Sequence, residues 1–123
     1  MNNSTPVSIN TIYESAKLII HSNNKVQDSF WRDYCTHVLT CLINHLHKKS
    51  EVTLSDCLDQ LDIYEPMELM FKINVYNSKE KTAIERFPNQ ERFLASKANM
   101  AVFILTSTLK LYCDKGQYSH LFE

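Results

Sequence analysis

The sequence predicts an all-α domain: a compact multi-helix bundle with two long central helices and several short ones. Glycine occurs only once, at Gly116, whereas hairpins and phosphate-binding loops need glycine where φ is positive or where backbone meets ligand. Apolar residues recur at helical spacing along most of the chain, and helix-capping residues precede two of these stretches. There is no G-x-x-x-x-G-K-[ST] or G-x-G-x-x-G motif, so we expect neither a nucleotide nor another cofactor.

Length and charge limit the class of protein. A chain of 123 residues suits one domain, so we expect a single unit over 1–123 with a frayed terminus over 1–7. The net charge of −1 disfavours binding of the whole chain to DNA or to an anionic membrane. The start, MNNSTPVSIN, lacks the basic and apolar regions of a signal peptide, and no apolar run approaches ~20 residues. We therefore expect a cytoplasmic protein with reduced cysteines and no membrane contact.

Two long helices should contribute most of the core. The longer apolar runs predict a helix from about Phe30 to His47, with Asp28 or Ser29 as its N-cap, and a second from near Asn89 to Cys113. The second is apolar nearly all round, which indicates an enclosed helix, and Gly116 is a plausible residue to end it. The residues expected in the core are Phe30, Trp31, Leu39, Leu42, Leu46, Phe103 and Leu109.

Shorter elements are predicted around these two helices. An amphipathic helix is expected within VSINTIYESAKLIIHS, and KKSEV should form a turn. Thr53 and Asp56 form a capping-box-like pair before a short helix whose buried face is Leu54, Leu58 and Leu61. Pro66 should begin another helix through MELMFKI, although FKINVYN also alternates like a strand. The stretch NSKEKTAIERFPNQERF is predicted to be polar and irregular.

A metal or nucleophilic site is disfavoured by the spacing of cysteines and histidines. His37, Cys41 and His45 lie at i, i+4 and i+8, so all three span ~12 Å along a helix and cannot share one ion. Further ligands would have to come from Cys57, Cys113 or His120. No local pattern marks an activated thiolate. We expect no metal and no catalytic residues, and we expect the cysteines to fill the core.

Charge is distributed unevenly along the chain. Between 51 and 68 there are six acidic residues and no lysine or arginine: Glu51, Asp56, Asp59, Asp62, Glu65 and Glu68. Between 72 and 97 six basic residues outnumber three acidic ones: Lys72, Lys79, Lys81, Arg86, Arg92 and Lys97. The acidic segment is either a solvated face, paired within the fold with the basic segment, or a docking surface for basic protein segments.

These two segments supply the candidate binding residues. The candidates for protein binding are Asp56, Asp59, Asp62, Glu65 and Glu68. A basic strip that touches nucleic acid would use Lys79, Lys81, Arg86 and Arg92, although few aromatic residues lie near it.

The order of these features resembles a known family. Asp28, Phe30 and Trp31 match a D-x-F-W opening, which a long apolar helix follows. The later segments TLSDCLDQL, LMF and SKANMAVFILTSTLKLYCD come in a similar order. This pattern, from about Ile9 to Phe122, resembles the all-alpha domain of type IV coupling proteins, the hexameric ATPases of type IV secretion and conjugation. The start of the helix, DYCTHVL, departs from the alanine-rich start of many members, and the ATPase motifs are absent from this chain.

The resemblance implies a function in recognition and no catalysed reaction. It implies a non-enzymatic substrate-recognition domain at the cytoplasmic face of the bacterial inner membrane, attached in the parent protein to the rest of the ATPase. Its partners would be a relaxase, relaxosome accessory proteins or effector proteins, with direct DNA binding a weaker expectation. The alternative is a free-standing cytoplasmic helical adaptor or chaperone that binds a partner protein. A small DNA-binding regulator is a third alternative, disfavoured by the slightly acidic chain.

Overall fold

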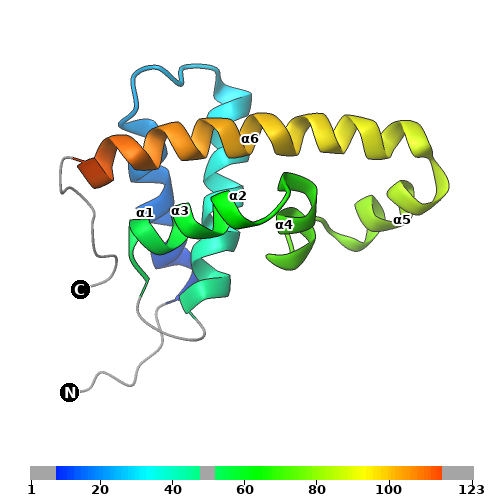
Figure 1. The fold of residues 1–123 in the computed structure, drawn as a ribbon, viewed down its shortest axis with the longest axis horizontal. Helices are drawn as coiled ribbons and strands as arrows, with labels where there is room; N and C mark the ends of the chain where they lie inside the picture. The colour runs from blue at the N-terminus through cyan, green and yellow to red at the C-terminus, as the bar shows by residue number, and fades with distance from the viewer. Residues whose placement is uncertain (1–7, 48–51, 115–123) are drawn as a thin grey trace.

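Six helices make up the fold in the computed structural model, which describes residues 8–47 and 52–114 (Figure 1). They are α1 (Ile9–His21), α2 (Ser29–His47), α3 (Leu54–Ile63), α4 (Pro66–Lys72), α5 (Ser78–Arg86) and α6 (Pro88–Asp114). No strand occurs within the described ranges, and the all-α prediction is confirmed. The predicted frayed terminus, most of the KKSEV turn and Gly116 lie outside the described residues.

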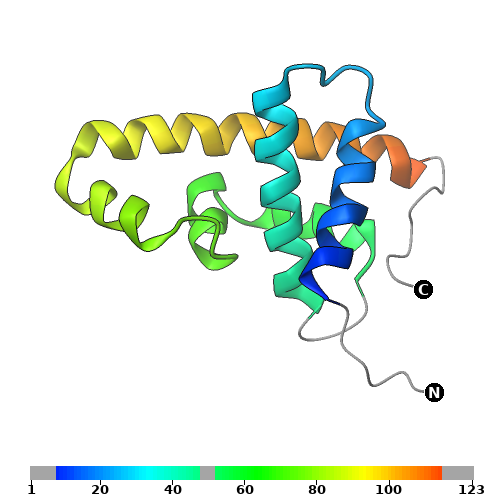
Figure 2. The same ribbon diagram turned by 180° about the vertical axis from the view of Figure 1, so that it is seen from behind.

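The longest helix, α6, organises the others. It contacts all five of them. The antiparallel pair α1 and α2 crosses behind both α6 and α3 in the view of Figure 1, while α3, α4 and α5 follow the length of α6 beside it (Figures 1 and 2). Thus α3 lies beside the C-terminal half of α6, and α5 folds back along its N-terminal half (Figure 1).

Local capping explains where several helices begin. The Asp28 carboxylate accepts a hydrogen bond from the Trp31 backbone N–H at 3.2 Å, as an N-cap residue does. Thr53 and Asp56 form the predicted capping box at the start of α3. Asn77 and Glu80 form a second capping box at the start of α5. The prediction of irregular structure over this polar stretch was therefore wrong.

The core is continuous across the bundle, but it excludes two of the residues predicted for it. Leu39, Leu42 and Leu109 are fully buried as expected, while Trp31 and Leu46 are partly buried against the core. Phe30 is 49% exposed and Phe103 is 67% exposed, so their prediction as core residues was wrong. Phe103 projects from the side of α6 opposite the buried Leu105 and Leu109 row, where no other helix packs on it. The prediction that α6 is enclosed on all sides was wrong for the same reason.

The segment that could have been a strand is a helix end instead. Asn74 adopts φ 64°, in the left-handed region. The Asn74 N–H donates to the Phe71 carbonyl and the Val75 N–H donates to the Met70 carbonyl, which together form a Schellman motif. The alternating apolar residues Ile73 and Val75 are buried at this turn. None of the helices in the described part of the chain is long and apolar enough to cross a membrane.

Candidate protein-binding site

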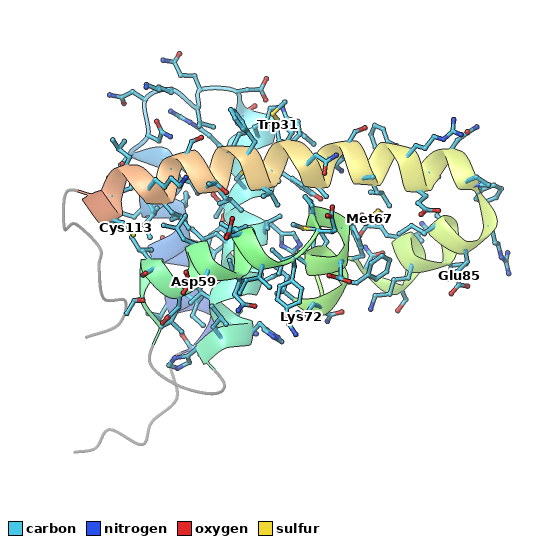
Figure 3. The ribbon with its side chains drawn as sticks, in the orientation of Figure 1. Trp31, Asp59, Met67, Lys72, Glu85 and Cys113 are labelled. Carbon is cyan, nitrogen blue, oxygen red and sulfur yellow. The ribbon has the colours of Figure 1, made fainter. Side chains whose placement is uncertain are left out.

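Helix α3 presents an acidic outer face because its apolar and acidic residues alternate at helical spacing. Leu54 and Leu61 are buried, and Leu58 is partly buried against the core. Asp59 and Asp62 therefore project from the other side of the helix and are exposed. Figure 3 shows Asp59 on α3, where this helix runs alongside α6.

A groove lies between α3 and the C-terminal half of α6. It has a volume of about 340 Å³ and is lined by Leu58, Asp59, Leu61, Asp62, Thr106 and Lys110. The partly buried Leu58 provides apolar surface, Leu61 reaches the groove with only 5% of its surface exposed, and the two carboxylates and the Lys110 ammonium provide opposite charges in the lining. Such a combination suits an extended or helical segment that carries both basic and apolar side chains.

The acidic residues of this groove are not neutralised within the fold. Among the described residues, neither Asp59 nor Asp62 has an ion pair or hydrogen bond through its carboxylate. Lys72, the first basic residue after the acidic segment, places its ammonium 4.8 Å from the centre of the Tyr64 ring. The alternative of internal pairing between the acidic and basic segments is thus not realised in the part of the chain that the structure describes.

The five acidic candidates do not form one site. Only Asp59 and Asp62 line the groove. Asp56 accepts the Thr53 backbone N–H at 3.0 Å, so its carboxylate serves the helix cap. Glu65 is the N-cap residue of α4, and Glu68 lies in its first turn; both are exposed outside the groove.

The basic candidates gather at the opposite end of the molecule. Lys79, Lys81 and Arg86 lie on α5, and Arg92 follows in the first turns of α6. Lys81 donates a hydrogen bond to the Asn74 side chain at 3.0 Å, which ties it to the turn after α4. Glu80 and Glu85 interrupt the positive charge on α5, and nucleic-acid contact stays a prediction.

The histidine and cysteine pair on α2 lacks the electrostatics of a nucleophilic site. The His37 Nε2 atom lies 4.0 Å from Cys41 Sγ and 3.3 Å from the Val75 carbonyl oxygen. Burial raises the pKa of the Cys41 thiol, whereas a nucleophilic cysteine needs a lowered pKa. No group of three or more potential ligands that could hold a metal ion occurs among the residues described.

An aromatic cluster around Lys97 was not anticipated from the sequence. The Lys97 ammonium lies 4.6 Å from the ring centre of Tyr34 and 5.4 Å from the ring centres of Phe30 and Phe93. Phe30 also stacks on Tyr34 and meets Trp31 edge to face. The i, i+4 spacing of Phe93 and Lys97 is a local signal that could have predicted their contact. The contacts of Lys97 with Phe30 and Tyr34 depend on how α2 crosses α6, which no local signal predicts.

Comparisons with protein-family models, with curated proteins and with solved structures found no match to this chain. The resemblance to type IV coupling proteins therefore depends on the sequence pattern alone.

Proposed function

We propose that this chain is a non-enzymatic recognition domain that binds a basic segment of a partner protein in the groove between α3 and α6. One observation carries the proposal: within the described ranges, the exposed carboxylates of Asp59 and Asp62 have no ion pair or hydrogen bond, and they lie beside the apolar surface of Leu58.

The groove favours a particular kind of segment. Lysine or arginine side chains would meet the two carboxylates, which accelerates encounter and aligns the segment. Apolar side chains packed on the partly exposed Leu58 would supply affinity that persists in salt. Lys110 adds one positive charge to the lining of the groove. An acidic residue or the carboxyl terminus of the bound segment would pair with Lys110, and this pairing would fix the direction in which the segment lies.

The sequence resemblance supports a more specific setting for this binding. It suggests a type IV coupling protein whose all-alpha domain receives a relaxase, a relaxosome accessory protein or an effector before transfer. Its support consists of the D-x-F-W opening at Asp28, Phe30 and Trp31 and the order of the later segments. A free-standing adaptor or chaperone would use the same groove. A reading frame that continues into a phosphate-loop motif upstream of codon 1 would support the coupling protein, and in-frame stop codons on both sides would favour the adaptor.

Peptide binding tests the proposed function directly. A fluorescent peptide that alternates arginine and leucine should bind the full chain, with an affinity that falls as salt rises. D59K/D62K should weaken binding at least ~tenfold, because each reversed charge repels the peptide. E14K/D33K is the matched control, since it changes the net charge equally at exposed positions on α1 and α2. Equal losses in both variants would mean that only net charge matters, and would overturn the groove as the site.

A further inference from the structure

The outer side of α6 carries a stripe of apolar residues that none of the other helices in the described part of the chain covers. Phe93 is 59% exposed, Met100 45%, Phe103 67% and Leu111 38%. At ~100° per residue, Phe93, Met100 and Leu111 point in nearly the same direction, and Phe103 lies within ~80° of them. The stripe extends ~27 Å along the helix. So much exposed apolar surface on one helix marks a surface that another molecule covers.

Small polar residues fill the gaps in this stripe. Ser96 and Ser107 are exposed and lie between the apolar residues on the same face. From Phe93 through Ser96, Met100 and Phe103 to Ser107 the spacings alternate between three and four residues, and Leu111 follows after a further four, as in a helix that packs along another helix. Paired serines allow two backbones to approach closely, while the large residues interlock on either side.

This order is self-complementary when a second α6 runs antiparallel to the first. A twofold axis between Ala101 and Val102 sets Met100 opposite Phe103 and Ser96 opposite Ser107, and it places Phe93 one residue, ~1.5 Å along the axis, from the position opposite Leu111. That axis lies at the middle of α6 (Pro88–Asp114). A symmetric contact requires each residue to meet a suitable partner on an identical surface, and here small residues meet small ones while large residues meet large ones.

The charge distribution favours the same antiparallel arrangement. Helix α3, with Asp59 and Asp62, lies beside the C-terminal half of α6, and α5 lies beside its N-terminal half (Figure 1). The twofold axis would therefore place the end of one copy that carries Arg86 and Arg92 at the same level along the helix axis as the acidic α3 of the other copy. A parallel pair would instead place like ends together. The positive charge of Lys110 partly offsets the attraction between these ends. The remaining attraction would act at long range to orient the two copies, and it would leave the groove open.

We infer that the exposed stripe on α6 binds a second copy of this chain, so that the protein forms an antiparallel homodimer through α6. Cargo binding in the groove is a separate property, because the groove opens between α3 and α6 and the stripe lies on the outer side of α6.

Sedimentation equilibrium of the full chain tests the inference first. The wild-type protein should show a concentration-dependent mass that approaches twice the 14.4 kDa of one chain. M100E/F103E should remain monomeric at the same concentrations and keep the wild-type circular dichroism spectrum, because both side chains are exposed. L18E is the matched control: Leu18 is exposed on α1, away from the stripe, and its variant should still dimerise.

Cysteine cross-linking then tests the direction of the helices. A mixture of S96C and S107C proteins should form a cross-linked dimer under mild oxidation, and neither variant alone should exceed the wild-type background from its native cysteines. Cross-linking of S96C alone would indicate a parallel pair and would overturn the arrangement. A monomeric wild-type chain, or M100E/F103E that still dimerises, would overturn the inference itself. Because M100E/F103E leaves the groove intact, peptide binding by this variant tests the proposed function independently.

Discussion

The side-chain amide of Asn23 donates a hydrogen bond to the hydroxyl of Thr108 at 2.7 Å, and this bond joins the α1–α2 connector to the C-terminal half of α6. Thr108 is fully buried and Asn23 nearly so. The side-chain Oδ1 atom of Asn23 accepts a hydrogen bond from the Lys25 backbone N–H at 3.1 Å. Beside this bond, the hydroxyls of Ser22 and Tyr112 also share a hydrogen bond. The polar connector is thus fixed to the longest helix at two adjacent points.

Replacing Thr108 with valine should lower the free energy of unfolding by ~1–3 kcal/mol, because the buried Asn23 amide would lose its partner while the shape of the side chain is kept. Urea denaturation measures this change. Thr106→Val makes the same chemical change at a partly exposed position of α6 and should cost much less. Equal costs for the two variants would show that the bond to Asn23 does not stabilise the fold.

The aromatic residues at the start of α2 should contribute unequally to stability. Leu39→Ala, at a fully buried position, should cost ~2–5 kcal/mol. Trp31→Ala should cost ~2 kcal/mol because its ring is only partly buried. Phe30→Ala should cost ~1 kcal/mol, from its contacts with Tyr34, Trp31 and Lys97. Chemical denaturation of the three variants gives the order, and a Phe30 cost equal to that of Leu39 would contradict the exposed position of its ring.

The misplacement of Phe30 and Phe103 shows what the sequence could not provide. Hydrophobic periodicity and caps identified both ends of α2 and α6, and the start of α3, to within about one residue, since those signals are local. Which side of an apolar helix has neighbours depends on how α1, α2 and α3 pack on it. The sequence of α6 is apolar nearly all round, and nothing local distinguishes the buried Leu105 from the exposed Phe103.

The missed helix α5 had a different cause. The polar composition of this segment and its few apolar residues predicted irregular structure. The capping pair of Asn77 and Glu80, which was not recognised in the sequence, is sufficient to start a helix there. The site was predicted in part. The acidic character of Asp59 and Asp62 was visible in the sequence, but their groove forms only because α3 packs beside Thr106 and Lys110, which are distant in sequence.

The turn after α4 should respond to glycine in a specific way. Asn74 has φ 64°, a conformation that most residues adopt only at a cost of ~1–2 kcal/mol. Asn74→Gly should leave stability unchanged or raise it by up to ~1 kcal/mol, and Asn74→Ala should lower it by ~1 kcal/mol. Thermal unfolding compares the two variants. Both lose the hydrogen bond with Lys81, so that loss cancels; an alanine variant as stable as the glycine variant would contradict the backbone explanation.

Stability should fall as pH rises above about 9, because of buried thiols. Burial raises the pKa of Cys35 and of Cys57 to about 12, from an ordinary value of 9.0. The unfolded chain releases these protons near its ordinary pKa while the folded chain retains them, so the stabilisation present below about pH 9 is lost between there and about 12. Burial likewise raises the pKa of Tyr34 to about 12, which adds to the loss above pH 10.

Thermal unfolding at pH 7 and pH 10 tests this linkage. The melting temperature of the wild-type chain should fall between the two pH values. C35A/C57A should start from a lower melting temperature at pH 7, because it leaves space in the core, but it should lose less on the change to pH 10. A variant whose melting temperature falls as much as the wild type would assign the pH dependence to other groups.

Helix α5 should open more readily than the rest of the fold. None of its residues is buried, Ile84 is only partly buried against the core, and the helix packs chiefly on the N-terminal half of α6. Few buried apolar contacts permit local opening without global unfolding. In hydrogen exchange measured by mass spectrometry, peptides from α5 should exchange well before peptides from α2, whose buried face includes Val38, Leu39 and Leu42.

A variant that removes the N-cap of α5 tests whether this helix opens independently of the rest of the fold. Asn77→Ala removes the side-chain acceptor for the Glu80 N–H at 2.8 Å, a change that destabilises a helix start by ~1 kcal/mol. Exchange in α5 should therefore quicken by ~fivefold, while exchange in α3 stays as in the wild type. The matched variant Thr53→Ala should do the reverse, since it removes the same kind of cap from α3. If α5 were protected as strongly as α2, or if N77A quickened exchange throughout the chain, α5 would belong to the cooperative core.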